Sequence, residues 1–146
     1  MRIAVVNGPN LNLLGTREPA LYGRHTLADI EARLSDVARE LRVELEFAQR
    51  NGEGALIDYV QSLRQRVSGA VVNAGAYSHT SLALRDAFAA AEVPFVEVHV
   101  TNVFAREPER RHSMLASAAL GVLCGFGAYG YELALRGLVA RLEARD

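Results

Sequence analysis

Hydrophobic positions along the chain alternate between short continuous runs and longer stretches with helical spacing. In the longer stretches, apolar residues recur at helical spacing, which predicts amphipathic helices at 26–42, 53–67, 81–91 and 129–145. The short runs are rich in β-branched residues and predict strands at 3–6, 43–47, 70–73, 95–100 and 120–124. Polar connectors separate these elements, and the longest are residues 8–25 and 101–112.

This alternation of strand and helix predicts one α/β domain that covers residues 1–146. Strands this apolar are expected to be buried on both faces, as in a parallel sheet covered by helices. Five strands in a chain of 146 residues favour a flavodoxin-like three-layer sandwich with a parallel sheet in the order 2-1-3-4-5. Thr26 and Asp29 predict a capping box at the first helix, and Ser78 or Thr80 is expected to cap the third.

Polar side chains gather where three of the predicted strands end. Because ligands bind beyond the carboxyl ends of parallel strands, these segments are expected to form one site. The candidates are Asn7, Asn10, Asn12, Arg17 and Tyr22 after the first strand, Asn73, Tyr77, Ser78 and His79 after the third, and Glu97, His99, Thr101, Asn102, Arg106 and Arg110 at and beyond the fourth.

The connector at 8–25 contains a cation and a phenol, Arg17 and Tyr22. A tyrosine phenol has an ordinary pKa of about 10, and a nearby guanidinium favours its ionised form. The pair is therefore a candidate base for removing a proton from carbon, with a surface loop that carries an unrelated arginine and tyrosine as the alternative. Gly15, Pro19 and Gly23 are consistent with a hinged lid over the site.

Glu97 and His99 lie two residues apart on a predicted strand, so both side chains point to the same face. A carboxylate beside an imidazole fixes its tautomer and favours the protonated ring. With His79 added, the residue types also match a catalytic zinc site, but no HExxH-type helical spacing supports a metal. A purely structural pair is the other alternative.

Composition excludes several kinds of chemistry. All 16 basic residues are arginine, so neither a Schiff-base lysine nor a P-loop lysine is available. The formal net charge of −1 argues against nucleic acid or an anionic membrane as partner, and no apolar stretch is long enough to cross a bilayer. The single cysteine, Cys124, allows no internal disulfide and lies in an apolar run that predicts burial. With no signal peptide expected, the predicted location is cytoplasmic.

Three other functions found on similar folds need sequence features that this chain lacks. Residues 125–130 match a GxGxxG dinucleotide fingerprint, but only one helix follows them, so their glycines are interpreted as turn and packing residues. A flavin electron carrier would need a Ser/Thr-rich phosphate loop where this chain has Gly8-Pro-Asn-Leu-Asn12. A phospho-receiver would need a lysine after the fifth strand, and the chain has none.

Four motifs together resemble the type II 3-dehydroquinate dehydratase family over nearly the whole chain: NGPNLNLLGTREPALYG, NAGAYSHTSLALRDA, EVHVTNVFAREPERRHS and CGFGAYGY. The resemblance implies loss of water from 3-dehydroquinate to give 3-dehydroshikimate, in the shikimate or quinate pathways. It implies no cofactor and no metal. The type I enzymes perform this conversion through a lysine Schiff base, a route that the missing lysine excludes here.

The resemblance also implies a role for each candidate residue. The implied catalytic residues are Tyr22 as base, Arg17 as its activator, Asn10 near the developing enolate, and His99 paired with Glu97 as proton donor, with His79 as an alternative donor. The implied substrate-binding residues are Asn73, His79, Val100, Thr101, Arg106, Arg110 and, from a neighbouring subunit, Asp86. Family members assemble as trimers grouped into dodecamers, so a homo-oligomer of this kind is expected.

Overall fold

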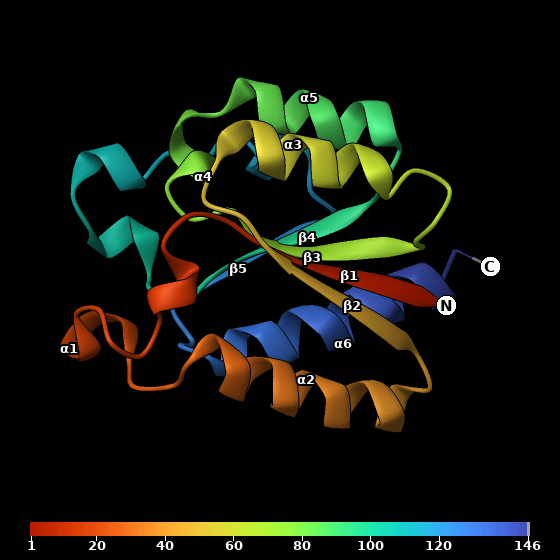
Figure 1. Ribbon diagram of the computed structural model, residues 1–146, viewed down its shortest axis with the longest axis horizontal. Coiled ribbons are helices and arrows are strands. Elements are labelled where there is room, and N and C mark those ends of the chain that lie inside the picture. The colour runs from red at the N-terminus through yellow and green to blue at the C-terminus, as the bar shows by residue number, and fades with distance from the viewer. Residues whose placement is uncertain (146) are drawn as a thin grey trace.

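The computed structural model describes residues 1–145, which form a five-stranded parallel sheet with helices on both faces (Figure 1). The strands are β1 (Arg2–Asn7), β2 (Glu44–Gln49), β3 (Gly69–Asn73), β4 (Phe95–His99) and β5 (Gly121–Cys124). The helices are α1 (Pro19–Tyr22), α2 (Leu27–Leu41), α3 (Glu53–Ser62), α4 (Tyr77–Thr80), α5 (Leu82–Ala91) and α6 (Tyr129–Glu143). The sheet order β2-β1-β3-β4-β5 confirms the predicted flavodoxin-like topology.

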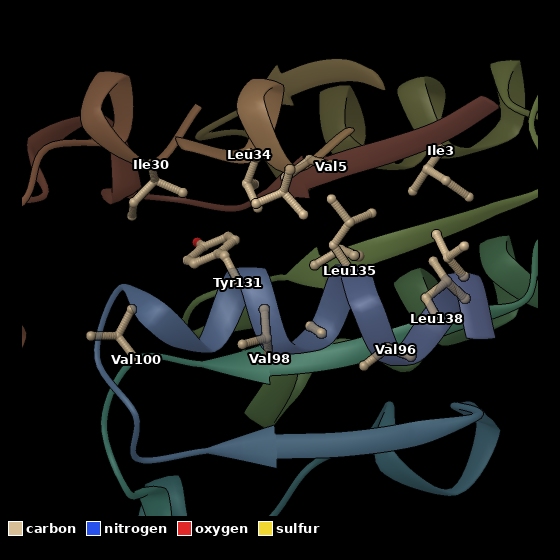
Figure 2. Packing of buried hydrophobic residues seen from close by; sticks show 14 of the residues in the cluster. Ile3, Val5, Ile30, Leu34, Val96, Val98, Val100, Tyr131, Leu135 and Leu138 are labelled. Carbon is tan, nitrogen blue, oxygen red and sulfur yellow. The ribbon is translucent and has the colours of Figure 1, made fainter. Parts of the chain in front are cut away.

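The apolar strands build two separate cores, one on each face of the sheet. Successive residues of a strand point to opposite sides, so Ile3 and Val5 of β1 pack in the cluster with α2 and α6. Ala4 and Val6 pack in the cluster with α3 and α5. In Figure 2, Leu135 of α6 points toward Ile3 and Val5. Because both faces are covered, the interior positions of β1 and β3 are apolar, as the sequence predicted, whereas β4 buries Glu97 among its apolar residues.

Helix α2 begins at the predicted capping box. The Asp29 amide donates to Thr26 Oγ1 at 3.1 Å, and the Thr26 amide donates to Asp29 Oδ2 at 3.0 Å. The hydrogen bond from the Thr26 amide also lowers the pKa of Asp29. The prediction of this helix start is therefore confirmed at the level of individual hydrogen bonds.

The predicted cap of α5 is wrong. Ser81 caps this helix, because its Oγ accepts from the Leu84 amide at 2.9 Å, whereas neither Ser78 nor Thr80 does so. The one-turn helix α4, which the sequence analysis did not predict, comes between β3 and α5. The long helix α5 therefore begins at Leu82, and its N-cap residue is Ser81.

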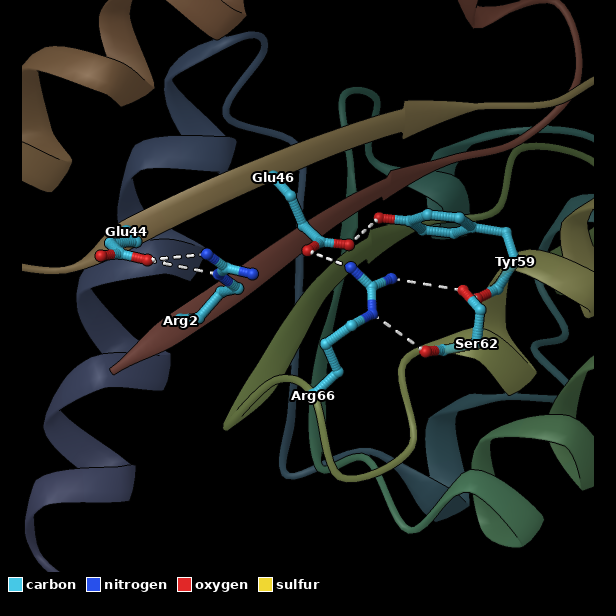
Figure 3. A network of polar contacts seen from close by, with 6 residues as sticks. All are labelled: Arg2, Glu44, Glu46, Tyr59, Ser62 and Arg66. Carbon is cyan, nitrogen blue, oxygen red and sulfur yellow. Dashed lines mark hydrogen bonds and ion pairs between the residues drawn. The ribbon is translucent and has the colours of Figure 1, made fainter.

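Helix α3 ends at Ser62 rather than at residue 67, and Arg66 folds back over its end. Arg66 Nε donates to the Ser62 carbonyl at 3.0 Å, and Arg66 Nη1 donates to Glu46 Oε2 of β2 at 2.7 Å. Figure 3 shows this network, in which the Tyr59 hydroxyl donates to Glu46 Oε1 at 2.6 Å. The guanidinium thus satisfies a carbonyl at the helix end and ties α3 to the sheet.

A charged cluster joins α2 to α6. The buried carboxylate of Glu132 accepts from Arg33 Nε at 2.9 Å and from Arg136 Nη2 at 3.1 Å. The hydrogen bond from Arg33 and then that from Arg136 lower the pKa of Glu132. Two cations therefore offset the desolvation of one carboxylate between these helices.

The edge strand β5 is less covered than predicted. It ends the sheet within the described residues, Val122 is 45% exposed, and Cys124 is half-buried rather than buried. No helix among residues 1–145 has both the length and the apolar character that a membrane span requires.

The two long connectors meet at the carboxyl ends of the strands. Figure 1 shows α1 and the turns between β4 and β5 at this end of the sheet, opposite the N-terminus. The connector at 8–25 contains a 3-10 turn (Leu11–Leu13) and α1, and it passes close to β3 at Gly8. A Cβ atom on Gly8 would lie 2.2 Å from the Ala74 carbonyl oxygen, so only glycine fits this approach.

Candidate active site

One cavity beyond the carboxyl ends of β1, β3 and β4 collects most of the predicted site residues. It has a volume of about 140 Å³. Its lining includes the predicted residues Asn10, Arg17, Tyr22, Asn73, His79, His99, Val100, Thr101, Arg106 and Arg110. Glu97 is fully buried and bonded to His99, whereas Asp86 is an exposed residue of α5 that does not line the cavity.

The phenol of Tyr22 lies beside two arginines. Arg106 Nη1 donates to Tyr22 Oη at 2.8 Å. The guanidinium carbons of Arg17 and Arg106 each lie 5.2 Å from the centroid of the Tyr22 ring. The ring also packs against the apolar cluster below the sheet. Two guanidinium groups therefore lie against the same phenol ring.

A buried carboxylate holds His99. Its Nε2 lies 2.9 Å from Glu97 Oε1, as the same-face spacing predicted. The Ser113 hydroxyl donates to the same carboxylate oxygen at 2.6 Å. Among the described residues, the other oxygen, Glu97 Oε2, has no hydrogen-bond partner.

His79 stacks beside His99, with ring centroids 5.9 Å apart. His79 Nδ1 lies 2.7 Å from the carbonyl oxygen of His112, and because a carbonyl only accepts, Nδ1 carries the hydrogen. Burial, followed by the charges of His99 and Arg110, lowers the pKa of His79 below its ordinary value. The ring is therefore neutral near pH 7, and its Nε2 is a hydrogen-bond acceptor.

A buried chain of polar groups orients Asn73. Asn73 Nδ2 donates to Tyr131 Oη at 2.9 Å, and the Tyr131 hydroxyl donates to Asn7 Oδ1 at 2.6 Å. The Gly75 amide donates to Asn73 Oδ1 at 3.1 Å. Burial raises the pKa of Tyr131, so its phenol stays protonated. With both ends of its amide engaged, Asn73 faces the cavity in one orientation.

Asn10 reaches the cavity from a left-handed backbone conformation, with φ of 69°. Asparagine tolerates this region better than most residues. The Asn10 amide donates to Asn51 Oδ1 at 3.0 Å, and the Asn10 carbonyl accepts from the Leu13 amide at 3.0 Å. These contacts fix the start of the connector where it enters the site.

The two histidines and Glu97 do not form a metal centre. Across residues 1–145, no group of three or more His, Cys, Asp or Glu side chains is arranged to hold a metal ion. His79 Nδ1 and Glu97 Oε1 are already engaged by protein groups. The zinc alternative considered from residue types therefore finds no geometry to support it in this part of the chain.

Sequence reasoning missed the groups that support the site. Ser113 belongs to one of the four motifs, but its neighbours in the sequence do not reveal that it binds Glu97. Tyr131 offered a better signal, because a hydroxyl on the apolar face of a helix needs a partner when it is buried. The asparagines that end β1 and β3, Asn7 and Asn73, are those partners.

Comparisons with known proteins identify the family. The model of the family described as dehydroquinase class II matches residues 1–139. A 3-dehydroquinate dehydratase from Gemmatimonas aurantiaca is 66% identical over 145 residues, which cover 99% of this chain and 95% of that protein. One from Synechococcus sp. (strain WH7803) is 57% identical and covers 98% of this chain and 97% of its own length. The crystal structure of type II dehydroquinase from Butyrivibrio crossotus matches with a TM-score of 0.91 at 38% identity, over 94% of this chain and 97% of that one. This chain belongs to the class II dehydroquinase family, as its four motifs predicted.

Proposed function

We propose that this protein dehydrates 3-dehydroquinate to 3-dehydroshikimate by anti elimination through an enolate. The observation that carries the proposal is that Tyr22, with its two arginines, lines the same cavity as His99 with its buried carboxylate. The reaction needs a base next to the ketone and an acid at the leaving hydroxyl. These two assemblies supply one of each.

Tyr22 acts as the base in this proposal. Arg17 and Arg106 favour its phenolate, which takes a proton from the carbon next to the ketone and leaves an enolate. Asn10 lies on the cavity wall where a side-chain dipole, acting through an ordered water, can stabilise that negative charge. Arg106 thereby acquires a second role beyond the substrate contact that the sequence suggested, because it bonds the phenol oxygen directly.

His99 acts as the acid. The carboxylate of Glu97 favours the protonated imidazole, which gives its proton to the hydroxyl as the enolate collapses and expels water. His79 is the weaker candidate, because burial lowers its pKa and its Nδ1 is paired with a backbone carbonyl rather than with a carboxylate. We therefore assign His79 to accept a hydrogen bond from a substrate hydroxyl.

The remaining cavity residues bind the substrate in this scheme. Asn73 and the backbone amides of Val100 and Thr101 hold the carboxylate, and Arg110 contacts a ring hydroxyl. Asp86 reaches the site of a neighbouring subunit in a dodecamer built from trimers. Its exposed position on α5 and its place outside this chain's own cavity support that role.

The test is a direct assay with purified protein and 3-dehydroquinate, followed by the ultraviolet absorbance of the conjugated product. Tyr22→Phe should lower kcat by about 10²–10⁴-fold while the substrate still binds. Tyr59→Phe is the matched control, because it removes a phenol that bonds Glu46 outside the cavity, and it should keep full turnover. Wild-type protein that leaves 3-dehydroquinate unchanged would refute the function, and an active Tyr22→Phe would refute the base assignment.

A second measurement separates this route from imine chemistry. Borohydride added with the substrate traps a lysine Schiff base, and this chain contains no lysine. Turnover should therefore survive the treatment unchanged. Irreversible loss of activity that depends on substrate would contradict the enolate route.

A further inference from the structure

We propose that Ser113 is a positioning residue for His99, which acts through Glu97 to keep the ring hydrogen on Nε2 and to leave Nδ1 for the substrate. The inference rests on the proposed function, in which His99 is the acid. It concerns a residue that follows the arginine-rich loop and does not line the cavity.

The Ser113 hydroxyl has only one direction in which to donate. Its oxygen accepts from the Leu115 amide at 3.1 Å and from the Ala116 amide at 3.1 Å. Two acceptor sites are all that a serine hydroxyl offers. Its hydrogen is therefore directed to Glu97 Oε1, which lies 2.6 Å away.

This direction decides the tautomer of His99. Glu97 Oε1 receives the Ser113 hydrogen, so that oxygen acts as an acceptor. His99 Nε2, at 2.9 Å from the same oxygen, must then be the donor. The conclusion follows because an oxygen of an ionised carboxylate accepts hydrogen bonds and does not donate them. Nδ1 is the ring nitrogen that remains for the substrate.

The same short segment also sets the tautomer of His79. The carbonyl of His112 accepts from His79 Nδ1, and the Met114 amide donates to the Ser78 carbonyl at 2.7 Å. Residues 112–114 therefore hold both stacked rings, one through a backbone carbonyl and the other through Ser113 and Glu97. His79 therefore carries its hydrogen on Nδ1, whereas neutral His99 carries its hydrogen on Nε2. The proton that His99 delivers as the acid is then the one that adds at Nδ1.

The residue that follows this segment anchors it in an apolar core. Leu115 is fully buried in the cluster between the sheet and α5, directly after the three supporting residues. The loop at 101–112, which carries Arg106 and Arg110, therefore ends on a rigid anchor that is bonded to the acid pair. Loss of the Ser113 hydroxyl would remove a hydrogen bond to Glu97 Oε1 and leave the packing of Leu115 in the apolar core intact.

Steady-state kinetics supply the first test. Ser113→Ala should lower kcat by about tenfold to a hundredfold, the effect of losing one hydrogen bond to a charged group, with KM within about threefold of wild type. Ser113→Thr keeps the hydroxyl and should restore most of kcat. Ser62→Ala is the matched control, because its hydroxyl belongs to the network of Figure 3 away from the cavity, and its kcat should not change.

Nitrogen NMR of protein labelled with ¹⁵N-histidine supplies the second test, and the chain has only four histidines to assign. In wild type, His99 should show hydrogen on Nε2 and His79 hydrogen on Nδ1. In Ser113→Ala, the His99 signals should move toward a mixture of tautomers while the His79 signals stay in place. A general loss of structure would change the signals of both stacked rings, not those of His99 alone.

Two results overturn the inference: a wild-type His99 with hydrogen on Nδ1 and none on Nε2, or a Ser113→Ala variant with kcat within twofold of wild type. The wild-type spectrum decides the matter even if the alanine variant does not fold. It also separates this inference from the proposed function, because absence of wild-type turnover would refute the activity while the tautomers could still be measured.

Discussion

Replacement of Tyr131 by phenylalanine tests the buried chain that orients Asn73. The change removes one oxygen, which donates to Asn7 Oδ1 and accepts from Asn73 Nδ2, and leaves the ring in the core shown in Figure 2. Each buried polar group left without a partner costs about 1–3 kcal/mol. Two such groups give a loss of about 2–6 kcal/mol in the free energy of unfolding.

The structure favours a loss toward the lower end of this range. Asn7 and Asn73 are partners in the register of β1 and β3, so their amides can approach each other once the phenol oxygen is gone. A direct bond between them would recover part of the loss. However, Asn7 Nδ2 already has no partner among the described residues, so the pair starts with an unsatisfied donor. We therefore expect about 2–4 kcal/mol.

Urea unfolding at one protein concentration measures this loss, since oligomerisation would make stability depend on concentration. Tyr59→Phe is the control, because its phenol bonds the partly exposed Glu46, where water can replace it, and should cost about 1 kcal/mol or less. In the same Tyr131→Phe sample, kcat/KM should fall by about tenfold as Asn73 loses its fixed orientation. A loss no larger than that of Tyr59→Phe would refute the claim that the chain is a tightly coupled buried network.

Other contacts give outcomes that can be measured in the same way. Arg106→Lys keeps a positive charge near Tyr22 but loses the planar fork, so kcat should fall about tenfold in steady-state assays while circular dichroism is unchanged. Glu132 has a pKa lowered by its two arginine partners, so its stabilising effect is complete above its ordinary pKa of 4.5 and is lost as pH falls through the lower folded value. Glu132→Gln should therefore flatten the acid side of the plot of unfolding free energy against pH. Tyr131→Phe and Ser113→Ala share no partner, so in the double variant their unfolding costs should add within about 0.5 kcal/mol, and a larger coupling would contradict their independence.

The layers and strand order could be predicted because they follow from periodic patterns within single segments. The run that contains Ile3 and Val5 shows its burial on both faces without knowledge of its neighbours. The end of α3 could not be predicted in this way, because it depends on Arg66 reaching Glu46, 20 positions away in the sequence. The exposure of β5 likewise depends on its place at the edge of the sheet.

The candidate site shows the same division. Its cavity-facing residues could be predicted, since polar groups at the ends of apolar strands have few structural reasons to be there. Their supports could not, because each joins distant positions: Arg106 and Tyr22 are 84 apart, and Asn73 and Tyr131 are 58 apart. Such contacts depend on how helices and loops pack on the sheet, so they cannot be predicted from the sequence of one segment alone.

Two groups of the proposed mechanism are held in place by residues on opposite faces of the sheet. Asn73 is held from the α6 face, whereas Glu97 is held by Ser113 from the face covered by α3 and α5. Both supports are anchored in apolar cores, so the acid and the orienting amide are preorganised before substrate arrives. The base differs, because Tyr22 lies in a connector whose residues 16–21 are exposed. Its phenol is bonded instead to Arg106 of the other connector. We therefore expect movement of the two connectors to displace the base, while the hydrogen bonds that hold the acid stay in place.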